Sequence, residues 1–272
     1  MTTEPNLDTL AFHRDGFCQL PYRFSHLDLQ RITEAIDDVI SARPPGLVYE
    51  SDSDTVRALQ GAHLFNRLLG RLTQDRRLLR PAKQLLRGDV YLHQFKVNFK
   101  QAFVGGAWPW HQDFAYWHLL DGIPNANLVS AMIALDEISE FNGPVFFIRG
   151  SHNKGLFQNE TTEASEALKD LDRSFSSDLP FQLNKEDIAN LLQGSEIVAP
   201  KGPPGSVIFF AANVAHASLP NLTPYARRIV LVTYNRVDNA PLYNSKRRPE
   251  YIAGSAFQPL QEIADFTSEL HA

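Results

Sequence analysis

The sequence predicts a mainly β protein, a sandwich or barrel with flanking helices that come mostly from the N-terminal part of the chain. Most segments rich in Val, Ile, Phe and Tyr lie after Gly88, where short runs of this composition predict strands. Clusters such as "FNGP" and "KGPPG" separate these runs, as turns do. No G-x-G-x-x-G motif joins a strand to a helix, which argues against a dinucleotide-binding α/β fold.

Two segments have clear helix start signals. In residues 25–42, Leu and Ile recur at helical spacing, and Ser25 is placed to cap the first turn. A helical insertion is expected over about 160–194, where Asn184 precedes "KEDIANLLQ" as a cap. The first helix therefore belongs to the N-terminal support, and the second lies between the predicted strands.

A further helix is expected over residues 73–88, with Thr73 as its cap and Gly88 as its end. Pro81 lies inside this segment and predicts a break or kink, because proline lacks the N–H that the helix needs. Four arginines share helical spacing there, which favours a solvated helix face over a phosphate-binding stripe: Arg76, Arg77, Arg80 and Arg87.

The strands are expected in the second part of the chain, where apolar residues alternate with polar ones or form short β-branched and aromatic runs. The predicted strand segments are 89–99, 127–138, 144–152, 205–218 and 227–236. No repeat or low-complexity segment interrupts them, and 272 residues are compatible with one large unit. We therefore expect a single domain over residues 1–272, with the helical insertion between its strands.

Composition bounds the class of protein. The chain is 43% hydrophobic and 21% charged, with a net charge of −5, which is ordinary for a globular protein and offers no basic stripe for nucleic acid. No apolar segment is long enough to span a bilayer. Cys18 is the single cysteine, so an internal disulfide is impossible; we expect a buried small side chain and a cytoplasmic protein.

The stretch "WPWHQDFAYWH" contains all three tryptophans of the chain, together with His111 and Asp113. If it is a strand, these two side chains point to the same face and could bind one metal ion. His216, in "NVAHAS" after an apolar strand, offers a third ligand. Two histidines and one carboxylate form the facial triad of non-haem Fe(II) oxygenases, although the same set also suits catalytic zinc, and His111 alone could be a core histidine.

Arg227 strengthens the oxygenase hypothesis. It begins the predicted strand that follows His216, and an oxygenase that uses 2-oxoglutarate needs a cation for the far carboxylate of that cosubstrate. A guanidinium suits this task because its planar fork pairs with both carboxylate oxygens. Ser218 lies two residues after His216, on the same strand face, and could donate a second hydrogen bond. The alternative is that Arg227 is a surface charge beside Arg228.

With these residues in place, the sequence resembles the phytanoyl-CoA dioxygenase-like family of Fe(II)/2-oxoglutarate oxygenases over residues 10 to 250. Within the family it looks like bacterial L-proline trans-4-hydroxylases, and ectoine hydroxylase is a more distant relative. The segments that carry the resemblance are "GDVYLHQFKVN", "WPWHQDFAYW", "LDEISEFNGPVFFIRGSH" and "VLVTYNRVDNAP".

The resemblance implies a double-stranded β-helix, the cupin-like jelly roll, around one Fe(II) held by His111, Asp113 and His216. By the same matching, the residues in contact with 2-oxoglutarate would be Gln94, Asn98, Trp108, Ser130, Phe210, Ser218 and Arg227. For the substrate we expect Tyr116 and Trp117 to offer aromatic faces and Arg236 to bind a carboxylate. O2 is the third reactant of such enzymes.

The implied activity is hydroxylation of a free small amino acid, L-proline at the trans-4 position or an analogue such as pipecolate, with succinate and CO2 as co-products. Gln112 and Leu120 depart from the pattern of ectoine hydroxylases, so we expect them to mark substrate choice. Alternatives are hydroxylation of ectoine, leucine or a natural-product intermediate, a zinc hydrolase, and a non-catalytic metal-binding jelly roll. The expected partner is a small molecule, and the expected assembly is a monomer or homodimer.

Overall fold

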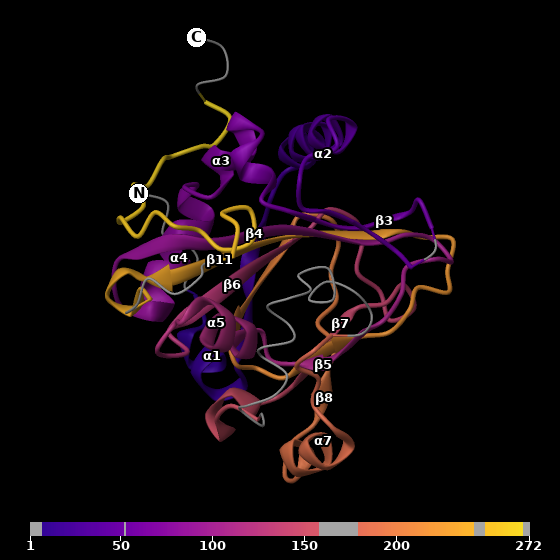
Figure 1. Cartoon of the computed structure of the whole chain (residues 1–272), viewed down its shortest axis with the longest axis vertical. Helices are drawn as coiled ribbons and strands as arrows, with labels where there is room; N and C mark the ends of the chain where they lie inside the picture. Colours follow the sequence, from indigo (N-terminus) through magenta and orange to yellow (C-terminus); the bar gives the residue numbers. More distant parts are fainter. Residues whose placement is uncertain (1–6, 52, 158–178, 242–247, 269–272) are drawn as a thin grey trace.

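The computed structural model describes residues 7–51, 53–157, 179–241 and 248–268. Its helices are α1 (Thr9–Asp15), α2 (His26–Ser41), α3 (Arg67–Leu72), α4 (Arg76–Leu86), α5 (Asp113–Asp121) and α7 (Lys185–Leu192) (Figure 1). Its strands are β1 (Phe17–Arg23), β2 (Leu47–Tyr49), β3 (Val56–Gln60), β4 (Val90–Lys100), β5 (Trp108–His111), β6 (Leu128–Ala134), β7 (Val145–Ile148), β8 (Ile197–Val198), β9 (Ser206–Ala211), β10 (His216–Ser218) and β11 (Arg227–Arg236). Short 3₁₀ turns lie at Ala62–Leu64, Ser151–Lys154 and Val237–Asn239.

The strands form two sheets. The larger sheet has the order β1-β9-β6-β11-β4-β3-β2, and the smaller has the order β5-β10-β7-β8. Neighbouring strands are antiparallel throughout both sheets. Helices α2 and α3 lie on one side of the large sheet and the small sheet lies on the other (Figure 1). This arrangement confirms the mainly β jelly roll buttressed by N-terminal helices.

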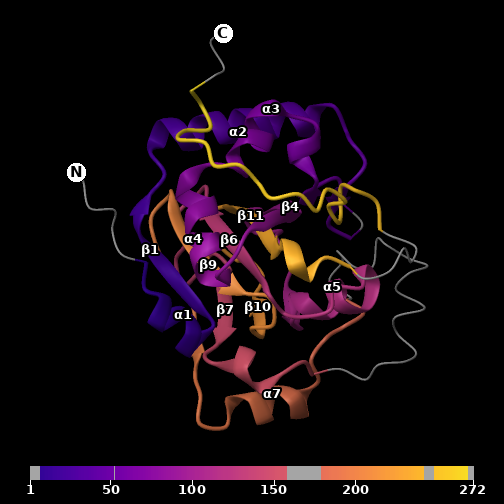
Figure 2. The same cartoon turned by 90° about the vertical axis from the view of Figure 1, so that its left-hand side faces the viewer.

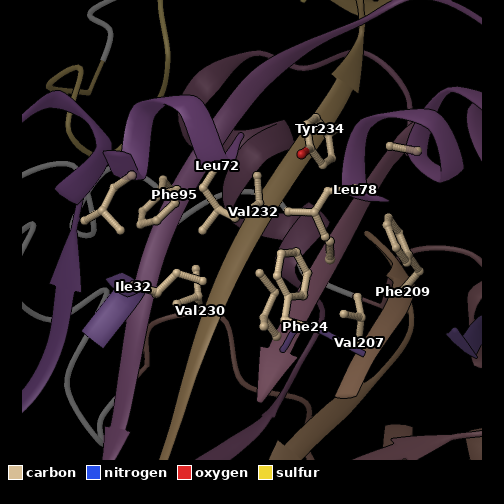
Figure 3. Close-up of a cluster of buried hydrophobic side chains, with 14 of the residues drawn as sticks. Phe24, Ile32, Leu72, Leu78, Phe95, Val207, Phe209, Val230, Val232 and Tyr234 are labelled. Atoms are coloured by element: carbon tan, nitrogen blue, oxygen red, sulfur yellow. The ribbon is translucent and has the colours of Figure 1, made fainter. Parts of the chain in front are cut away.

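The main hydrophobic core lies between the helices and the large sheet (Figure 3). Ile32 of α2 and Leu78 of α4 pack in the same cluster as Val230 and Val232 of β11. Burial of apolar surface of this kind is the dominant favourable contribution to folding, at about 25 cal/mol per Å². The helices therefore fix one face of the large sheet, so that its other face is free to form a cavity with the small sheet.

Strand alternation assigns side chains to these two faces. On β4 the face towards the helices carries Phe95, Val97 and Phe99. The opposite face of β4 carries the cavity residues Gln94, Lys96 and Asn98. On β11, Val230 and Val232 face the helices, while Arg227, Ile229 and Leu231 face the cavity. The period of two in each strand thus separates the core from the candidate site.

The predicted helix at residues 25–42 is confirmed. Helix α2 begins after Ser25, whose hydroxyl accepts a hydrogen bond from Asp28 N, while the Asp28 carboxylate accepts from Ser25 N. This reciprocal capping box satisfies two N–H groups that the first turn leaves without partners. Asn184 and Asp187 form the same box at α7, within the expected insertion; residues 158–178 of that insertion lie outside the described residues.

The predicted ends of the helix at 73–88 are wrong by a few residues. The cap is Asp75 instead of Thr73, because the Asp75 carboxylate accepts a hydrogen bond from the N–H of Arg77. The helix ends at Arg87, whose φ of 55° is left-handed, one residue before Gly88. A non-glycine residue can adopt this conformation at a helix end, although glycine does so at lower cost.

Helix α4 continues through Pro81 without the predicted break. Proline has no N–H to donate to the carbonyl of Arg77, four residues earlier. Tyr22 replaces the lost donor, because its hydroxyl donates to Arg77 O at 2.9 Å. The Arg77 side chain is not the free surface charge that the sequence predicted: its guanidinium lies 4.2 Å from the Phe24 ring centroid and pairs with Asp75.

The predicted strands largely agree with the structure. The segment 227–236 is β11 with the predicted bounds, and 89–99 corresponds to β4. The segment 205–218 is two strands, β9 in the large sheet and β10 in the small sheet, so the chain crosses between sheets there. Strands β1 and β3 and helix α5 were not predicted; α5 begins at Asp113, so "WPWHQDFAYWH" is a strand followed by a helix.

Two minor expectations also agree with the structure. Cys18 is 4% exposed in β1, and burial raises the pKa of its thiol to about 12, so it is a buried small side chain. Among the described residues, no helix has the length and apolar character needed to cross a bilayer.

Helix α7 lies at the opposite end of the molecule from α2 and α3 (Figure 2).

Candidate metal centre and cosubstrate cavity

His111, Asp113 and His216 meet at the small sheet. His111 ends β5 and His216 begins β10, and the two residues are register partners across these strands. Asp113 follows in the first turn of α5, so the change from strand to helix turns its carboxylate towards both rings. One potential ligand atom from each of the three buried residues lies within 4.8 Å of the others. The structure therefore brings the predicted triad together.

The orientation of both imidazoles leaves Nε2 facing the carboxylate. His111 Nδ1 lies 2.7 Å from Pro109 O, and His216 Nδ1 lies 3.0 Å from Val214 O. A carbonyl oxygen only accepts, so in each neutral ring Nδ1 carries the proton and Nε2 keeps its lone pair. The Nε2 atoms lie 3.7 and 3.9 Å from the two Asp113 carboxylate oxygens.

The electrostatics of the triad match those of metal ligands. Burial lowers the pKa of His111 to about 3, with a smaller contribution from His216, and burial also lowers the pKa of His216. Burial alone would raise the pKa of Asp113, but Lys96 and the two histidines outweigh it and hold that pKa at about 2. At neutral pH the triad is thus two neutral imidazoles and one carboxylate, the protonation states that metal binding requires.

One carboxylate oxygen of Asp113 is direct evidence for a cation site beside the triad. Asp113 Oδ2 is buried and has no hydrogen-bond partner among the described residues, whereas Oδ1 faces Lys96 Nζ at 3.4 Å. An unpartnered buried carboxylate oxygen is costly unless a cation occupies the adjacent space. Two histidines and a carboxylate hold Fe(II) on one face and leave open positions for other reactants; zinc is compatible with the same donors.

A cavity between the two sheets begins at this triad. The large sheet contributes Gln60, Gln94, Lys96, Asn98, Met132, Phe210, Arg227, Ile229 and Leu231. The small sheet and α5 contribute Trp108, His111, Asp113, Tyr116, Trp117, Val145, His216, Ala217 and Ser218. Leu179 and Arg248 complete the lining. The triad therefore opens onto a concave space with both apolar walls and a few polar groups, as ligand sites do.

Arg227 contributes a buried positive charge to the wall of the cavity. Its side chain is 1% exposed and donates from Nη2 to Gly143 O, while Nε is buried without a partner among the described residues. Burial lowers the pKa of Arg227 to about 10, which still leaves the guanidinium charged at neutral pH. Ser218 lines the same cavity two residues after His216 on β10. This cation and hydroxyl form a suitable site for a carboxylate.

The other predicted cosubstrate residues lie as follows. Trp108 and Phe210 line the cavity, and Trp108 lies 4.0 Å from the buried guanidinium of Arg57, measured from Cζ to the ring centroid. Gln94 donates from Nε2 to Ile252 O at 2.9 Å. Asn98 has a buried Oδ1 with no partner among the described residues, which marks it as a potential ligand contact.

Ser130 differs from this group. Its hydroxyl lies 2.9 Å from Thr233 Oγ1 on the neighbouring strand β11. Both residues are fully buried, and Ser130 is not among the described residues that line the cavity. The structure thus gives Ser130 a cross-strand hydrogen bond instead of a direct place at the cosubstrate site.

On the substrate side, Tyr116 and Trp117 line the cavity as expected, but Arg236 does not. Its guanidinium pairs with the exposed Asp238 and donates to Leu86 O. Arg236 is nine positions from Arg227 on β11, and an odd separation places side chains on opposite faces of a strand. The structure therefore does not bring Arg236 to the site.

Arg248 is a cavity cation that the sequence did not reveal. It is 5% exposed and forms two hydrogen bonds to Asp121, from Nε at 2.7 Å and from Nη2 at 2.6 Å. Burial opposes ionisation of Asp121, but Arg248 and His93 outweigh burial and hold its pKa at about 2. Arg248 lies in the polar segment "SKRRPE", where nothing in the local pattern signals burial.

Gln112 and Leu120 are not among the described residues that line the cavity. The buried Gln112 amide donates to Gly155 O and Asn213 O and accepts from Phe157 N. Leu120 packs in an apolar cluster with residues of α5 and its neighbours. Gln112 therefore links the loops of Gly155, Phe157 and Asn213, and Leu120 belongs to the apolar packing of α5.

Comparison with known proteins agrees with this geometry. The profile of the phytanoyl-CoA dioxygenase (PhyH) family matches residues 12–229. The chain is 36% identical to an L-proline trans-4-hydroxylase from Streptomyces griseoviridis over 95% of this chain and 96% of that enzyme. It is 34% identical to an ectoine dioxygenase from Stutzerimonas stutzeri over 92% of this chain and 84% of that enzyme.

A similar fold is found in the crystal structure of EctD from S. alaskensis with 2-oxoglutarate and 5-hydroxyectoine. The two structures superpose with a TM-score of 0.79 at 30% identity, over 97% of this chain and 89% of the other. A further structure of EctD contains bound Fe. The extent of these matches and the buried His-Asp-His triad lead to one conclusion: the chain belongs to the phytanoyl-CoA dioxygenase family and is a 2-oxoglutarate-dependent dioxygenase.

Proposed function

We propose that this enzyme is an Fe(II)/2-oxoglutarate-dependent hydroxylase of a free small amino acid, L-proline at the trans-4 position or a close analogue such as pipecolate. The observation that carries the proposal is one cavity that contains both the buried triad and the buried, partly unpartnered guanidinium of Arg227. The substrate class is supported by the 36% identity to an L-proline trans-4-hydroxylase over almost the whole of both chains.

The proposed roles follow from the contacts of each side chain. His111, Asp113 and His216 would hold Fe(II), with the two Nδ1 hydrogen bonds fixing both rings in orientation. Iron and 2-oxoglutarate, when bound, supply the oxidising chemistry that inserts one oxygen atom into a C–H bond and releases succinate and CO2. The remaining tasks of the protein are to orient the reactants and to exclude water.

Arg227 would bind the far carboxylate of 2-oxoglutarate. Its buried Nε–H has no partner among the described residues, so a carboxylate can accept from it without displacing another group. Ser218, on β10 of the small sheet, offers a hydroxyl to the same carboxylate. Trp108 and Phe210 form apolar walls of the cavity. A charge-assisted pair in such an enclosed site is stronger than one in water.

The substrate would lie on the side of the triad lined by Tyr116 and Trp117. Aromatic faces attract a cyclic ammonium, and the two rings are buried, so little water competes for it. Tyr116 lies 6.4 Å from the His111 ring, measured between centroids, in an edge-on arrangement. This contact supports a substrate position beside the proposed iron, because the reacting carbon must be held close to the metal.

A panel of free amino acids tests this proposal. The purified enzyme with Fe(II), 2-oxoglutarate and O2 should release succinate when L-proline or pipecolate is added, together with a hydroxylated product detected by mass spectrometry. Ectoine and leucine serve as comparison substrates. A zinc hydrolase would instead release no succinate with any amino acid and would depend on zinc, and that result would exclude the proposed function.

A further inference from the structure

Three cationic side chains occur among the described residues that line the cavity, and two of them already have a defined partner or a proposed ligand. Arg248 is neutralised by two short hydrogen bonds to Asp121. Arg227 lines the cavity and is the proposed partner of the cosubstrate carboxylate. Lys96 is the third, on the cavity face of β4. A zwitterionic substrate needs a cation for its carboxylate, so Lys96 is the candidate that remains among the described residues.

Lys96 has more N–H donors than hydrogen-bond partners among the described residues. Its ammonium carries three N–H groups, and its one partner among the described residues is Asp113 Oδ1, at the long distance of 3.4 Å. The side chain is 14% exposed, so little water reaches it. When a divalent cation shares the Asp113 carboxylate, the charge of Lys96 is left without a full counter-ion.

Gln60 adds an independent observation. Its side chain lines the cavity and the residue is 1% exposed, yet neither Oε1 nor Nε2 has a hydrogen-bond partner among the described residues. A buried primary amide without any partner costs free energy, about 1–3 kcal/mol for each unsatisfied group. Such an orphaned amide in the wall of a cavity indicates a polar ligand that supplies both a donor and an acceptor.

Gln60 and Lys96 lie side by side. They are register partners on the antiparallel strands β3 and β4, and such partners point to the same face with Cβ atoms about 4.5–5.5 Å apart. Lys96 in turn contacts the metal ligand Asp113. The pair therefore forms a polar patch on the large sheet, next to the triad, with donors from both residues and one acceptor, the Gln60 amide oxygen.

We propose that Gln60 and Lys96 bind the α-carboxylate and the neighbouring ammonium of the amino-acid substrate and thereby select free amino acids. The inference rests on the proposed function and adds the residues that define its substrate class. The Lys96 ammonium and the Gln60 Nε2–H donate to the carboxylate, and Gln60 Oε1 accepts from the substrate ammonium. This arrangement satisfies both orphaned amide atoms with one ligand.

The experiment uses the variants Lys96→Met and Gln60→Leu, with Lys201→Met as the matched control on the surface. Lys201 is half exposed and pairs with Glu140, and neither residue is among the described residues that line the cavity. The amino acid that gives most succinate with the unaltered enzyme is compared with its carboxamide. Kd is measured calorimetrically without O2, in the presence of Fe(II) and 2-oxoglutarate, alongside KM, kcat and iron content.

We expect Lys96→Met to raise the amino-acid Kd by about 10- to 100-fold, the loss of one charge-assisted hydrogen bond. It should also abolish the preference of the enzyme for the free acid over the carboxamide, while KM for 2-oxoglutarate stays unchanged. Gln60→Leu should raise Kd for the same ligand by about 10-fold. The control Lys201→Met should behave as the unaltered enzyme in every measurement.

Two results would overturn the inference while leaving the proposed function in place. In the first, both variants keep the amino-acid Kd and the preference for the free acid. In the second, Lys96→Met loses iron or raises KM for 2-oxoglutarate, but binds the amino acid normally once iron is restored; Lys96 would then only position Asp113. If the unaltered enzyme releases no succinate with any amino acid, the proposed function fails, and this inference fails with it.

Discussion

His111 and His216 are register partners on adjacent antiparallel strands, and their ring centroids lie 4.1 Å apart. The relationship explains how residues far apart in the sequence form one site, because the pairing of β5 with β10 brings them together. The strand-to-helix junction after His111 then adds Asp113 to the same point. The small sheet thus carries the two histidines of the proposed metal site, and the large sheet forms the opposite wall of the cavity.

Removal of a triad residue should abolish iron binding without unfolding the protein. We expect His111→Ala to weaken Fe(II) affinity by more than about 100-fold, the upper range for loss of a residue that only supports a ligand. Iron content after dialysis against a weak chelator measures this effect. His26→Ala, an exposed histidine, is the control and should retain full iron occupancy. Equal iron content in both variants would show that His111 is a core histidine.

Arg227 should determine affinity for the cosubstrate. Arg227→Met removes a charge-assisted carboxylate contact, so KM for 2-oxoglutarate should rise by about 100-fold, while iron content stays unchanged. Arg228→Met is the matched control, because Arg228 pairs with Asp136 and does not line the cavity. Unchanged KM in Arg227→Met, measured by succinate release, would contradict the proposed role of Arg227.

The pair of Asp121 and Arg248 should be important for stability and sensitive to acid. Asp121→Asn leaves the buried Arg248 without its counter-charge, which should lower the free energy of unfolding by about 3–5 kcal/mol in urea titrations. The double variant Asp121→Asn, Arg248→Met should recover part of this loss. If the double variant recovers none of the lost free energy of unfolding, the unpaired charge of Arg248 is not the cause of the loss.

The pH dependence of this loss has a definite sign. The pKa of Asp121 is lowered from 3.8 to about 2, so its contribution to stability is complete above pH 3.8 and disappears as pH falls towards 2. The difference in unfolding free energy between the unaltered enzyme and Asp121→Asn should therefore shrink over this window. A constant difference from pH 6 to pH 2 would be inconsistent with ionised Asp121 as its source.

The buried Lys100 should make the free energy of unfolding depend on pH in the neutral and alkaline range. Burial, with smaller contributions from Arg227 and Arg57, lowers its pKa from 10.5 to about 6. Between these values the unfolded chain binds one more proton at this site, so stability rises with pH by about 1.4 kcal/mol per unit from Lys100 alone. Lys100→Met should show a correspondingly smaller slope of unfolding free energy against pH; an unchanged slope would refute a neutral Lys100.

Much of the fold could be predicted because the large sheet separates a helix-packed face from a cavity face. The alternation in 227–236 predicted β11, and Ser25 predicted the start of α2. Strand β3 was missed because it is short and buried residues follow one another in it without alternation. Helix α5 was missed because buried residues occur on most of its circumference, so helical periodicity gives no signal.

Some residues of the candidate site could also be predicted from the sequence, and others could not. Short local spacing suggested His111 with Asp113 and His216 with Ser218, but these two segments lie far apart in the sequence, and the pairing of β5 with β10 brings them together. Arg248 could not be predicted, because it lies in a polar segment of the sequence. Its burial against Asp121 becomes apparent only in the folded structure. Arg236 was excluded only by its position on the opposite face of β11 from Arg227. Gln60 and Lys96 required the register of β3 against β4, which the sequence does not reveal.

The most direct test of the central claim is succinate release by the unaltered enzyme and by Asp113→Ala, with Fe(II), 2-oxoglutarate and O2, before and after addition of L-proline. After addition we expect succinate and hydroxylated amino acid in equal amounts from the unaltered enzyme, and neither product from Asp113→Ala. Succinate release that is the same in both proteins, or absent from both with every free amino acid, would contradict it.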